Sequence, residues 1–248
     1  ELWAWFSKKQ SEAAQNDVVR LDLLKSTYRV ERDSNPPLYQ AADEVAEKLR
    51  IGVRPTFCQS ESAGRLNAAL VYIPGEAHIV LTGPITTTLT PAELRSVVGH
   101  ELMHFALLDG WPEYLVASQL LAAMTNDRAA DGSHLASERL FTLYTEVYCD
   151  RAAYRATGDV LATISALVKL ATGAAGVSAA DYLRQTEEIF SKGHPRAEGL
   201  THPETFIRAK AMKRWAEDPK LATQETREVI EGPVSFAALD MLGQKRLA

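Results

Sequence analysis

The residues best suited to chemistry are two histidines and a glutamate, His100, Glu101 and His104, in the pattern His-Glu-x-x-His. On a helix, residues four apart lie on the same face, about 6 Å apart along the axis. Two imidazoles placed in this way can bind one metal ion, and the adjacent glutamate can hold and deprotonate a metal-bound water. The pattern therefore predicts a hydrolytic metal site. The alternative is a pair of buried structural histidines satisfied by hydrogen bonds.

A catalytic zinc site needs a third protein ligand, because such sites typically have three and keep one position for water. Glu146 and Asp150 are four apart in a segment with a helical pattern, so they share a face. Glu146 is predicted to be the third ligand, and Asp150 a carboxylate that accepts a hydrogen bond from a ligand histidine. Two solvated charges are the alternative, but apolar neighbours make unpaired carboxylates costly. Cys149 is a second candidate ligand and ranks below Glu146.

The elements that must position these residues follow from local patterns. Thr90-Pro91-Ala92-Glu93 is a capping box with proline at the first helical position, so a helix begins there and continues through the motif to about Gly110. Short strands are expected just before it, over 53–58, 66–73 and 78–82, with a turn at Pro74-Gly75. Further helices are expected over about 38–50, closed by Gly52, and over 111–125, 133–158, 160–170, 181–190 and from Pro203 onward. Residues 126–132 are expected to form a polar loop.

The N-terminal part has an aromatic start, Leu2-Trp3-Ala4-Trp5-Phe6, followed by Val18, Leu21, Leu24 and Tyr28 at helical spacing. We favour a helix packed on the body of the protein. A pro-segment or partner-docking helix that covers a cleft is the alternative. The tail is expected to end in a short amphipathic stretch over 234–242.

The composition sets broad limits on the class of protein. The chain has 248 residues, 46% hydrophobic and 24% charged, which is ample for a buried core. A net charge of -5 gives no reason to expect nucleic acid as a partner. The two cysteines, Cys58 and Cys149, are expected to be free thiols, which favours a cytoplasmic location. The best candidate for a membrane span, 160–177, contains Lys169 and two glycines and is read as a core helix. Peripheral membrane association and the oligomeric state are left open.

The metal motifs together resemble a known group of enzymes. His-Glu-x-x-His followed by Glu146-x-x-x-Asp150 resembles the gluzincin metallopeptidases, and more closely the HtpX-like and CAAX-prenyl-protease-type zinc endopeptidases. The strand that contains Asn67-Ala68 is similar to the edge strand that lies along bound substrate in that family. The strand 79–82 followed by 89–94 is similar to its run into the motif helix. Thr201-His202-Pro203 with Arg208 is similar to its His-Pro signature, and the resemblance spans roughly Phe57 to Trp215.

This resemblance implies a role for each matching residue. It implies one zinc ion per chain, bound by His100, His104 and Glu146, with Glu101 as general base. It implies that Asp150 accepts a hydrogen bond from the ligand His100. It also implies that His202 and Arg208 stabilise the oxyanion of the tetrahedral intermediate. It also implies that Asn67 and Ala68 bind the substrate backbone by strand addition. His194-Pro195 has a similar local form but no arginine six residues on, so it ranks second. His78 and His134 have no partner pattern and are read as structural.

The sequence therefore predicts an α+β, mainly helical, zincin-like metallopeptidase fold with a small, mostly antiparallel sheet packed on the active-site helix. We expect an N-terminal helical segment over 1–32, a metallopeptidase domain over 33–217 and a C-terminal helical extension over 218–248. The predicted function is a zinc-dependent endopeptidase that hydrolyses peptides or unfolded proteins with a Glu-activated, zinc-bound water. The first alternative is a latent or non-catalytic zinc-binding adaptor of the same fold. The second is a zinc hydrolase for a non-peptide, which the Asn67-Ala68 strand disfavours.

Overall fold

The computed structural model describes residues 13–61, 66–125, 132–193, 195, 197–198 and 202–231. Contacts along the chain divide it into two compact units. The first unit consists of Glu1–Val116 and Arg151–Ala179, and the second of Ala117–Asp150 and Ala180–Ala248. The predicted division into 1–32, 33–217 and 218–248 stays a prediction.

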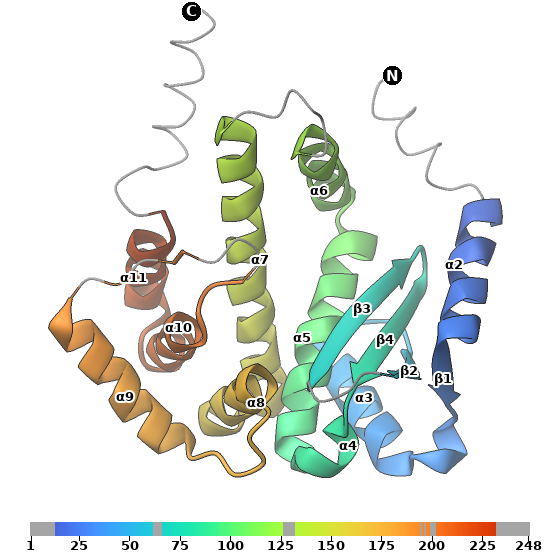
Figure 1. Cartoon of the computed structure of the whole chain (residues 1–248), viewed down its shortest axis with the longest axis horizontal. Helices are drawn as coiled ribbons and strands as arrows, with labels where there is room; N and C mark the ends of the chain where they lie inside the picture. The colour runs from blue at the N-terminus through green and yellow to red at the C-terminus, as the bar shows by residue number, and fades with distance from the viewer. Residues whose placement is uncertain are drawn as a thin grey trace, which may run out of the picture. The chain divides into compact units, whose positions relative to one another are not determined.

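The first unit contains a four-stranded mixed sheet in the order β1-β2-β4-β3 (Figure 1). β1 pairs antiparallel with β2, β2 pairs parallel with β4, and β4 pairs antiparallel with β3. Gly75 has a φ of +77° in the turn between β3 and β4, a conformation that glycine adopts without strain. The strands are β1 (Thr27–Val30), β2 (Thr56–Ser60), β3 (Asn67–Ile73) and β4 (Glu76–Thr82).

Two local predictions in this unit were wrong. The first helix, α2 (Ala13–Ser26), stops before Tyr28, which belongs to β1. The β-branched and aromatic residues of β1 suit a strand, and pairing with β2 outweighs the helical spacing of the apolar residues. The helix α3 (Pro36–Leu49) is closed by Arg50, not Gly52. Arg50 has a φ of 58°, and its N–H donates to the carbonyls of Ala46 and Glu47.

The core of the first unit lies between the sheet and the two helices α3 and α5 (Figure 1). Leu38 and Val45 of α3, Phe57 and Ile79 of the sheet, and Leu102 of α5 are completely buried there. Helix α8 packs on α5 as well. The remaining elements of this unit are η1 (Arg32–Ser34), α4 (Ile85–Thr88), α5 (Pro91–Gly110) and α8 (Val160–Thr172).

The predicted capping box at the start of α5 is confirmed. Thr90 Oγ1 accepts from the N–H of Glu93 at 3.3 Å, and Glu93 Oε2 accepts from the N–H of Thr90 at 2.8 Å. The buried Glu93 carboxylate also accepts from Lys169 Nζ at 2.8 Å and from Ser165 Oγ at 2.5 Å, both on α8. The beginning of the motif helix is therefore fixed to α8 by a buried, charge-assisted network.

Gly99 allows a neighbouring helix to approach α5 very closely. The neighbour is the C-terminal end of the long helix α7 (Gly132–Thr157), whose residues from Arg151 onward belong to the first unit. A Cβ built on Gly99 would lie 2.9 Å from Ala156 Cβ and 3.3 Å from Ala153 Cα. Since real Cβ atoms do not approach other atoms so closely, any side chain at position 99 would push the two helices apart.

The second unit is helical and contains most of α7. Its core consists of buried residues from α7, from the segment before α10, and from α10 and α11: Leu140, Leu143, Val147, Ala197, Ile207 and Ile230. The helices are α6 (Pro112–Thr125), whose first turn belongs to the first unit, α9 (Ala179–Lys192), α10 (Thr205–Glu217) and α11 (Pro219–Glu231). Asp218 Oδ1 accepts from the N–H groups of Lys220 and Leu221, so Asp218 and Pro219 form a helix start that the sequence analysis missed. Of the loop expected over 126–132, residues 126–131 lie outside the described residues, as does the stretch 234–242, and Gly132 already belongs to α7.

The fold is α+β and mainly helical with a small sheet, as the sequence predicts. Among the described helices, none combines the length and the apolar character that crossing a bilayer requires.

Replacing Gly99 with alanine tests the close approach of α5 and α7. Alanine favours helix by about 1 kcal/mol over glycine. A Cβ contact of 2.9 Å requires the helices to shift, so we place the cost of overpacking in the upper part of the usual range, at about 2–3 kcal/mol. We expect the free energy of unfolding, measured with urea, to fall by about 1–2 kcal/mol. Gly110→Ala, at the end of the same helix, is the control, because a Cβ there meets no atom within 4 Å. A Gly99→Ala protein as stable as the wild type would contradict the close packing.

The network at Glu93 predicts a specific pH dependence of stability. Burial raises the pKa of Glu93, but hydrogen bonds from Lys169, Ser165 and Thr90 outweigh it and bring the pKa below its ordinary value of 4.5. The stabilisation by Glu93 is therefore complete above that value and is lost as the pH falls through the lower pKa of the folded state.

We expect Glu93→Gln to lower the free energy of unfolding by about 3 kcal/mol at pH 7, because it leaves Lys169 buried without its counterion. The difference from wild type should shrink below about pH 4.5. Urea titrations between pH 3 and 7 measure it, with the exposed Glu47→Gln as control. If the stability difference between Glu93→Gln and wild type stays constant from pH 3 to pH 7, the ionised carboxylate of Glu93 is not the source of the stabilisation.

Candidate metal centre

The two motif histidines lie one turn apart on α5, and their side chains are partly buried. Their Nε2 atoms are 3.1 Å apart, and the ring centroids are separated by 4.9 Å. The shared helix face predicted from the spacing is therefore observed. Both rings present the same nitrogen to one point in space, as two ligands of a single ion must.

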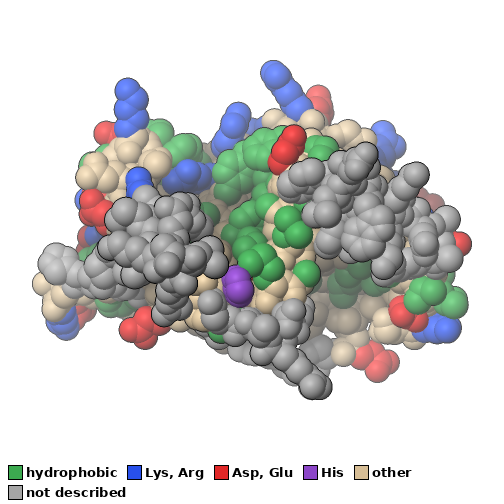
Figure 2. Space-filling model, turned by 90° about the horizontal axis from the view of Figure 1, so that it is seen from above, with side chains coloured by type: hydrophobic (Ala, Val, Ile, Leu, Met, Phe, Trp, Pro, Cys, Tyr) green, Lys and Arg blue, Asp and Glu red, His purple; other side chains and the backbone are tan. Residues whose placement is uncertain are grey.

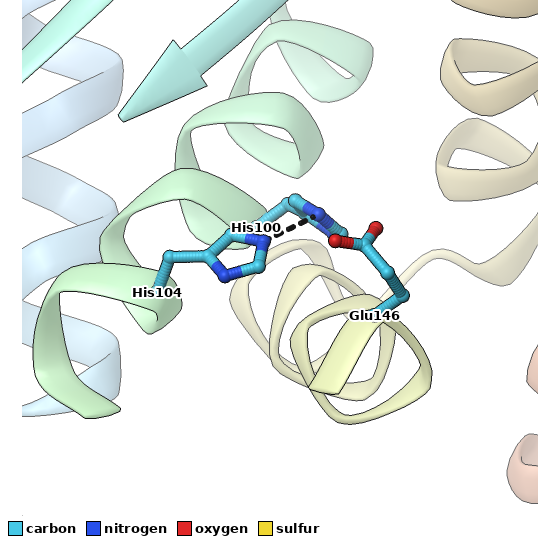
Figure 3. A group of neighbouring side chains, drawn as sticks. All are labelled: His100, His104 and Glu146. Carbon is cyan, nitrogen blue, oxygen red and sulfur yellow. Dashed lines mark hydrogen bonds between the residues drawn. The ribbon is translucent and has the colours of Figure 1, made fainter. Parts of the chain in front are cut away.

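Glu146 on α7 comes close to these two rings. One nitrogen from His100, one from His104 and one carboxylate oxygen of Glu146 all lie within 4.8 Å of one another. Figure 3 shows the three side chains pointing toward a common point. The packing at Gly99 helps to explain why Glu146 lies near the histidines. The residues of α7 that contact Gly99 begin six positions after Glu146, about 9 Å along the same helix.

The donor set suits a transition-metal ion. Two imidazole nitrogens and one carboxylate oxygen form a common ligand set of catalytic zinc sites. Zinc–nitrogen bonds of about 2.0–2.1 Å at a tetrahedral angle require nitrogens about 3.3 Å apart, and the observed separation of the Nε2 atoms is 3.1 Å. The two histidines therefore have the spacing that such an ion requires, and the Glu146 oxygen, within 4.8 Å of both nitrogens, is near enough to complete the set.

Glu101 is buried beside these ligands and has a main-chain partner. Its Oε2 accepts a hydrogen bond from the N–H of Leu70 on β3 at 2.9 Å. This bond orients the carboxylate of the expected general base. No sequence pattern predicts this bond, because the donor is a main-chain group and does not depend on the side chain of Leu70.

A buried arginine joins the two carboxylates of α7. Arg208 on α10 forms a bidentate ion pair with Asp150, with Nε–Oδ2 at 2.7 Å and Nη2–Oδ1 at 2.6 Å. Its Nη2 is also 3.5 Å from Glu146 Oε2. Burial lowers the pKa of Arg208, but the charges of Asp150 and Glu146 outweigh burial and raise it, so the guanidinium is firmly cationic.

His202 lies on the same side of Glu146. Its Nε2 is 3.4 Å from Glu146 Oε2, and 57% of its side chain is exposed. The second unit thus gathers Glu146, Asp150, His202 and Arg208, four of the residues selected from the sequence. The pairing of Asp150 with Arg208 was not foreseen, because 58 residues separate them and no local pattern connects the two positions.

The remaining candidates lie on other elements. Asn67 and Ala68 begin β3, which is an edge strand; Asn67 is exposed and Ala68 is buried. His78 on β4 is hydrogen-bonded to Glu76 at 3.0 Å. Cys58 and Cys149 are buried free thiols. His194 lies outside the described residues.

Comparison with known families agrees with this site. The model of peptidase family M48 matches residues 33–216. The chain belongs to peptidase family M48. Membership confirms the resemblance to HtpX-like and CAAX-prenyl-protease-type enzymes, and with it the zincin-like metallopeptidase fold. M48 peptidases are metal-dependent proteases, and the group of His100, His104 and Glu146 offers a metal site. No curated protein and no solved structure matched the chain.

The charged side chains of this M48 peptidase are mixed on the face shown in Figure 2. Among the described residues on that face, acidic and basic side chains are interspersed around its edge, and a histidine is visible near its centre beside hydrophobic side chains. This mixture does not resemble the single-sign surface that attracts a polyanion.

The geometry predicts which residues control metal content. Loss of a residue that hydrogen-bonds to a metal ligand typically raises the Kd for the metal roughly 10–100-fold. We expect His104→Gln and Glu146→Gln, which remove a ligand itself, to raise it by more than that. Metal content after dialysis, measured by elemental analysis, reports the effect. His78→Gln is the control, because His78 contacts Glu76 on β4 instead. Retention of metal by both ligand variants would rule out this centre.

Proposed function

We propose that this M48 peptidase is a zinc-dependent endopeptidase that hydrolyses peptide bonds in peptides or unfolded proteins. The observation that carries the proposal is the convergence of His100, His104 and Glu146 next to the buried carboxylate of Glu101. Three protein ligands leave a coordination position open, which distinguishes catalytic zinc sites from closed structural ones.

Zinc is the ion that best suits these ligands. Imidazole nitrogens favour zinc and its neighbours over magnesium or calcium, which prefer oxygen ligands alone. When bound, the ion supplies a Lewis acid that acidifies water and polarises the scissile carbonyl.

Glu101 is the proposed general base. It follows the ligand His100 directly, and the N–H of Leu70 holds its Oε2 at 2.9 Å. A carboxylate fixed in this way takes the proton of the attacking water and later delivers it to the leaving amine. A carboxylate has two acceptor atoms, and we assign the proton transfer to Oε1, the one that does not accept from Leu70.

The edge strand β3 supports a peptide as the substrate. Because the N–H of Leu70 points to Glu101, it points away from β4, and main-chain groups alternate between the two edges of a strand. The main chain of Ala68 therefore faces the same open edge as that of Leu70, and an extended substrate can add to the sheet there. By the same alternation the main chain of Asn67 faces β4. We therefore propose that Asn67 contacts the substrate through its side chain, which is exposed.

His202 is the proposed group that stabilises the oxyanion. Its imidazole lies 3.4 Å from the carboxylate of Glu146, and more than half of its side chain is exposed, so a substrate can reach it. A hydrogen bond from this ring to the developing negative charge would lower the barrier, as such donors do in other acyl-transfer sites.

Glu101→Gln tests the mechanism directly. The variant keeps the size and position of the side chain but cannot accept a proton. We expect zinc content to be unchanged and cleavage of a fluorescently labelled unfolded protein to fall roughly 10²–10⁴-fold. Glu47→Gln, an exposed change on α3, should keep full activity.

Cleavage by Glu101→Gln at the wild-type rate would exclude this mechanism. A wild-type protein that binds zinc and cleaves no unfolded protein would instead favour the latent or adaptor alternative.

A further inference from the structure

We propose that Arg208 is a positioning residue for the metal ligand Glu146. It acts by holding Asp150 in a bidentate ion pair and by fixing the Glu146 carboxylate from behind. The inference rests on the proposed zinc site and adds to it a residue that controls metal affinity. It replaces the oxyanion role that the family resemblance implies for Arg208.

The two carboxylates of α7 are buried negative charges close to each other, and a nearby cation is needed to compensate them. Glu146 and Asp150 are one helical turn apart, and both are buried, at 5% and 4% exposure. Like charges at this spacing repel each other, and burial strengthens the repulsion because water no longer screens it. Arg208 supplies the compensating charge, since it contacts Asp150 through two atoms and lies 3.5 Å from Glu146.

The geometry of the ion pair gives Arg208 a fixed orientation. A bidentate contact at 2.6 and 2.7 Å locks the plane of the guanidinium against Asp150. The same Nη2 atom that contacts Asp150 then faces Glu146 Oε2. The carboxylate of Glu146 consequently has a cation on one side, while Figure 3 shows it directed at the histidines of α5.

Burial separates the roles of Arg208 and His202. Arg208 is 9% exposed, and two of its nitrogens donate to Asp150. A group that stabilises an oxyanion must instead reach the substrate, and the His202 side chain is 57% exposed. The imidazole of His202 is thus suited to contact substrate, whereas the guanidinium of Arg208 acts through Glu146.

Zinc affinity is the measurement that tests this role. The full-length protein is compared in chelator competition as wild type, Arg208→Met, Arg208→Lys, Asp150→Asn and the double variant Asp150→Asn/Arg208→Met. We expect Arg208→Met to raise the Kd for zinc roughly tenfold or more. Arg208→Lys should have a smaller effect, since it keeps the charge but loses the bidentate contact.

Two further readouts separate positioning from a general structural role. If Asp150 and Arg208 act as one unit, their effects on zinc affinity should be strongly non-additive in the double variant. At saturating zinc, Arg208→Lys should recover most of the wild-type kcat. The matched control is Arg214→Met on the same helix, which removes an ion pair with Glu225 and should leave zinc affinity unchanged.

The possible failures are distinguishable. Wild-type zinc affinity in Arg208→Met, together with a kcat that stays low at saturating zinc, would restore the oxyanion role and overturn the inference. Additive effects in the double variant would also overturn it. If circular dichroism shows that Arg208→Met does not fold, Arg208→Lys carries the test, and wild-type zinc affinity in that variant counts against the inference. A wild-type protein that binds no zinc overturns the proposed function and this inference together.

Discussion

The close approach of α5 and α7 at Gly99 is the constraint on which the candidate site depends. His100 follows Gly99 directly, and the alanines of α7 that contact it continue the helix that carries Glu146 and Asp150. Glycine and alanine are the smallest residues, so they bring the two helix backbones as near as packing allows. Metal ligands tolerate displacements of only a few tenths of an ångström. A larger residue at this point would therefore disturb the ligand distances as well as the core.

Two of the buried carboxylates, Glu93 and Asp150, each pair with a cation from a different helix. Glu93 at the start of α5 pairs with Lys169 of α8, and Asp150 on α7 pairs with Arg208 of α10. In the first case the ion pair completes a helix cap and fixes where the motif helix begins. In the second it stands directly behind the candidate ligand Glu146. Breaking a buried pair is costly because the remaining charge lacks solvent, so both pairs lock their helices into one arrangement.

The sequence predicted what local spacing and capping determine. The helix through His100 and His104, its capping box at Thr90 and the common face of Glu146 and Asp150 all depend on residues within a few positions of one another. It failed where partners are distant. Tyr28 lies in a strand because that strand pairs with β2. The helix cap expected at Gly52 is formed by Arg50 in the left-handed conformation. Asp150 pairs with Arg208, which is 58 residues away in the sequence. Only the folded chain determines such contacts, and a single sequence contains no signal for them.

The hydrogen bond from Leu70 to Glu101 connects the substrate strand with the proposed base. The donor belongs to the main chain of β3, at the open edge where an extended peptide would pair. Any movement of β3 therefore moves both the expected substrate and the carboxylate that would activate its attacking water. Because every residue except proline has this N–H, side-chain identity at position 70 leaves the contact intact. The orientation of Glu101 is thus a property of how β3 packs on α5, which explains why a sheet must accompany a motif carried entirely by a helix.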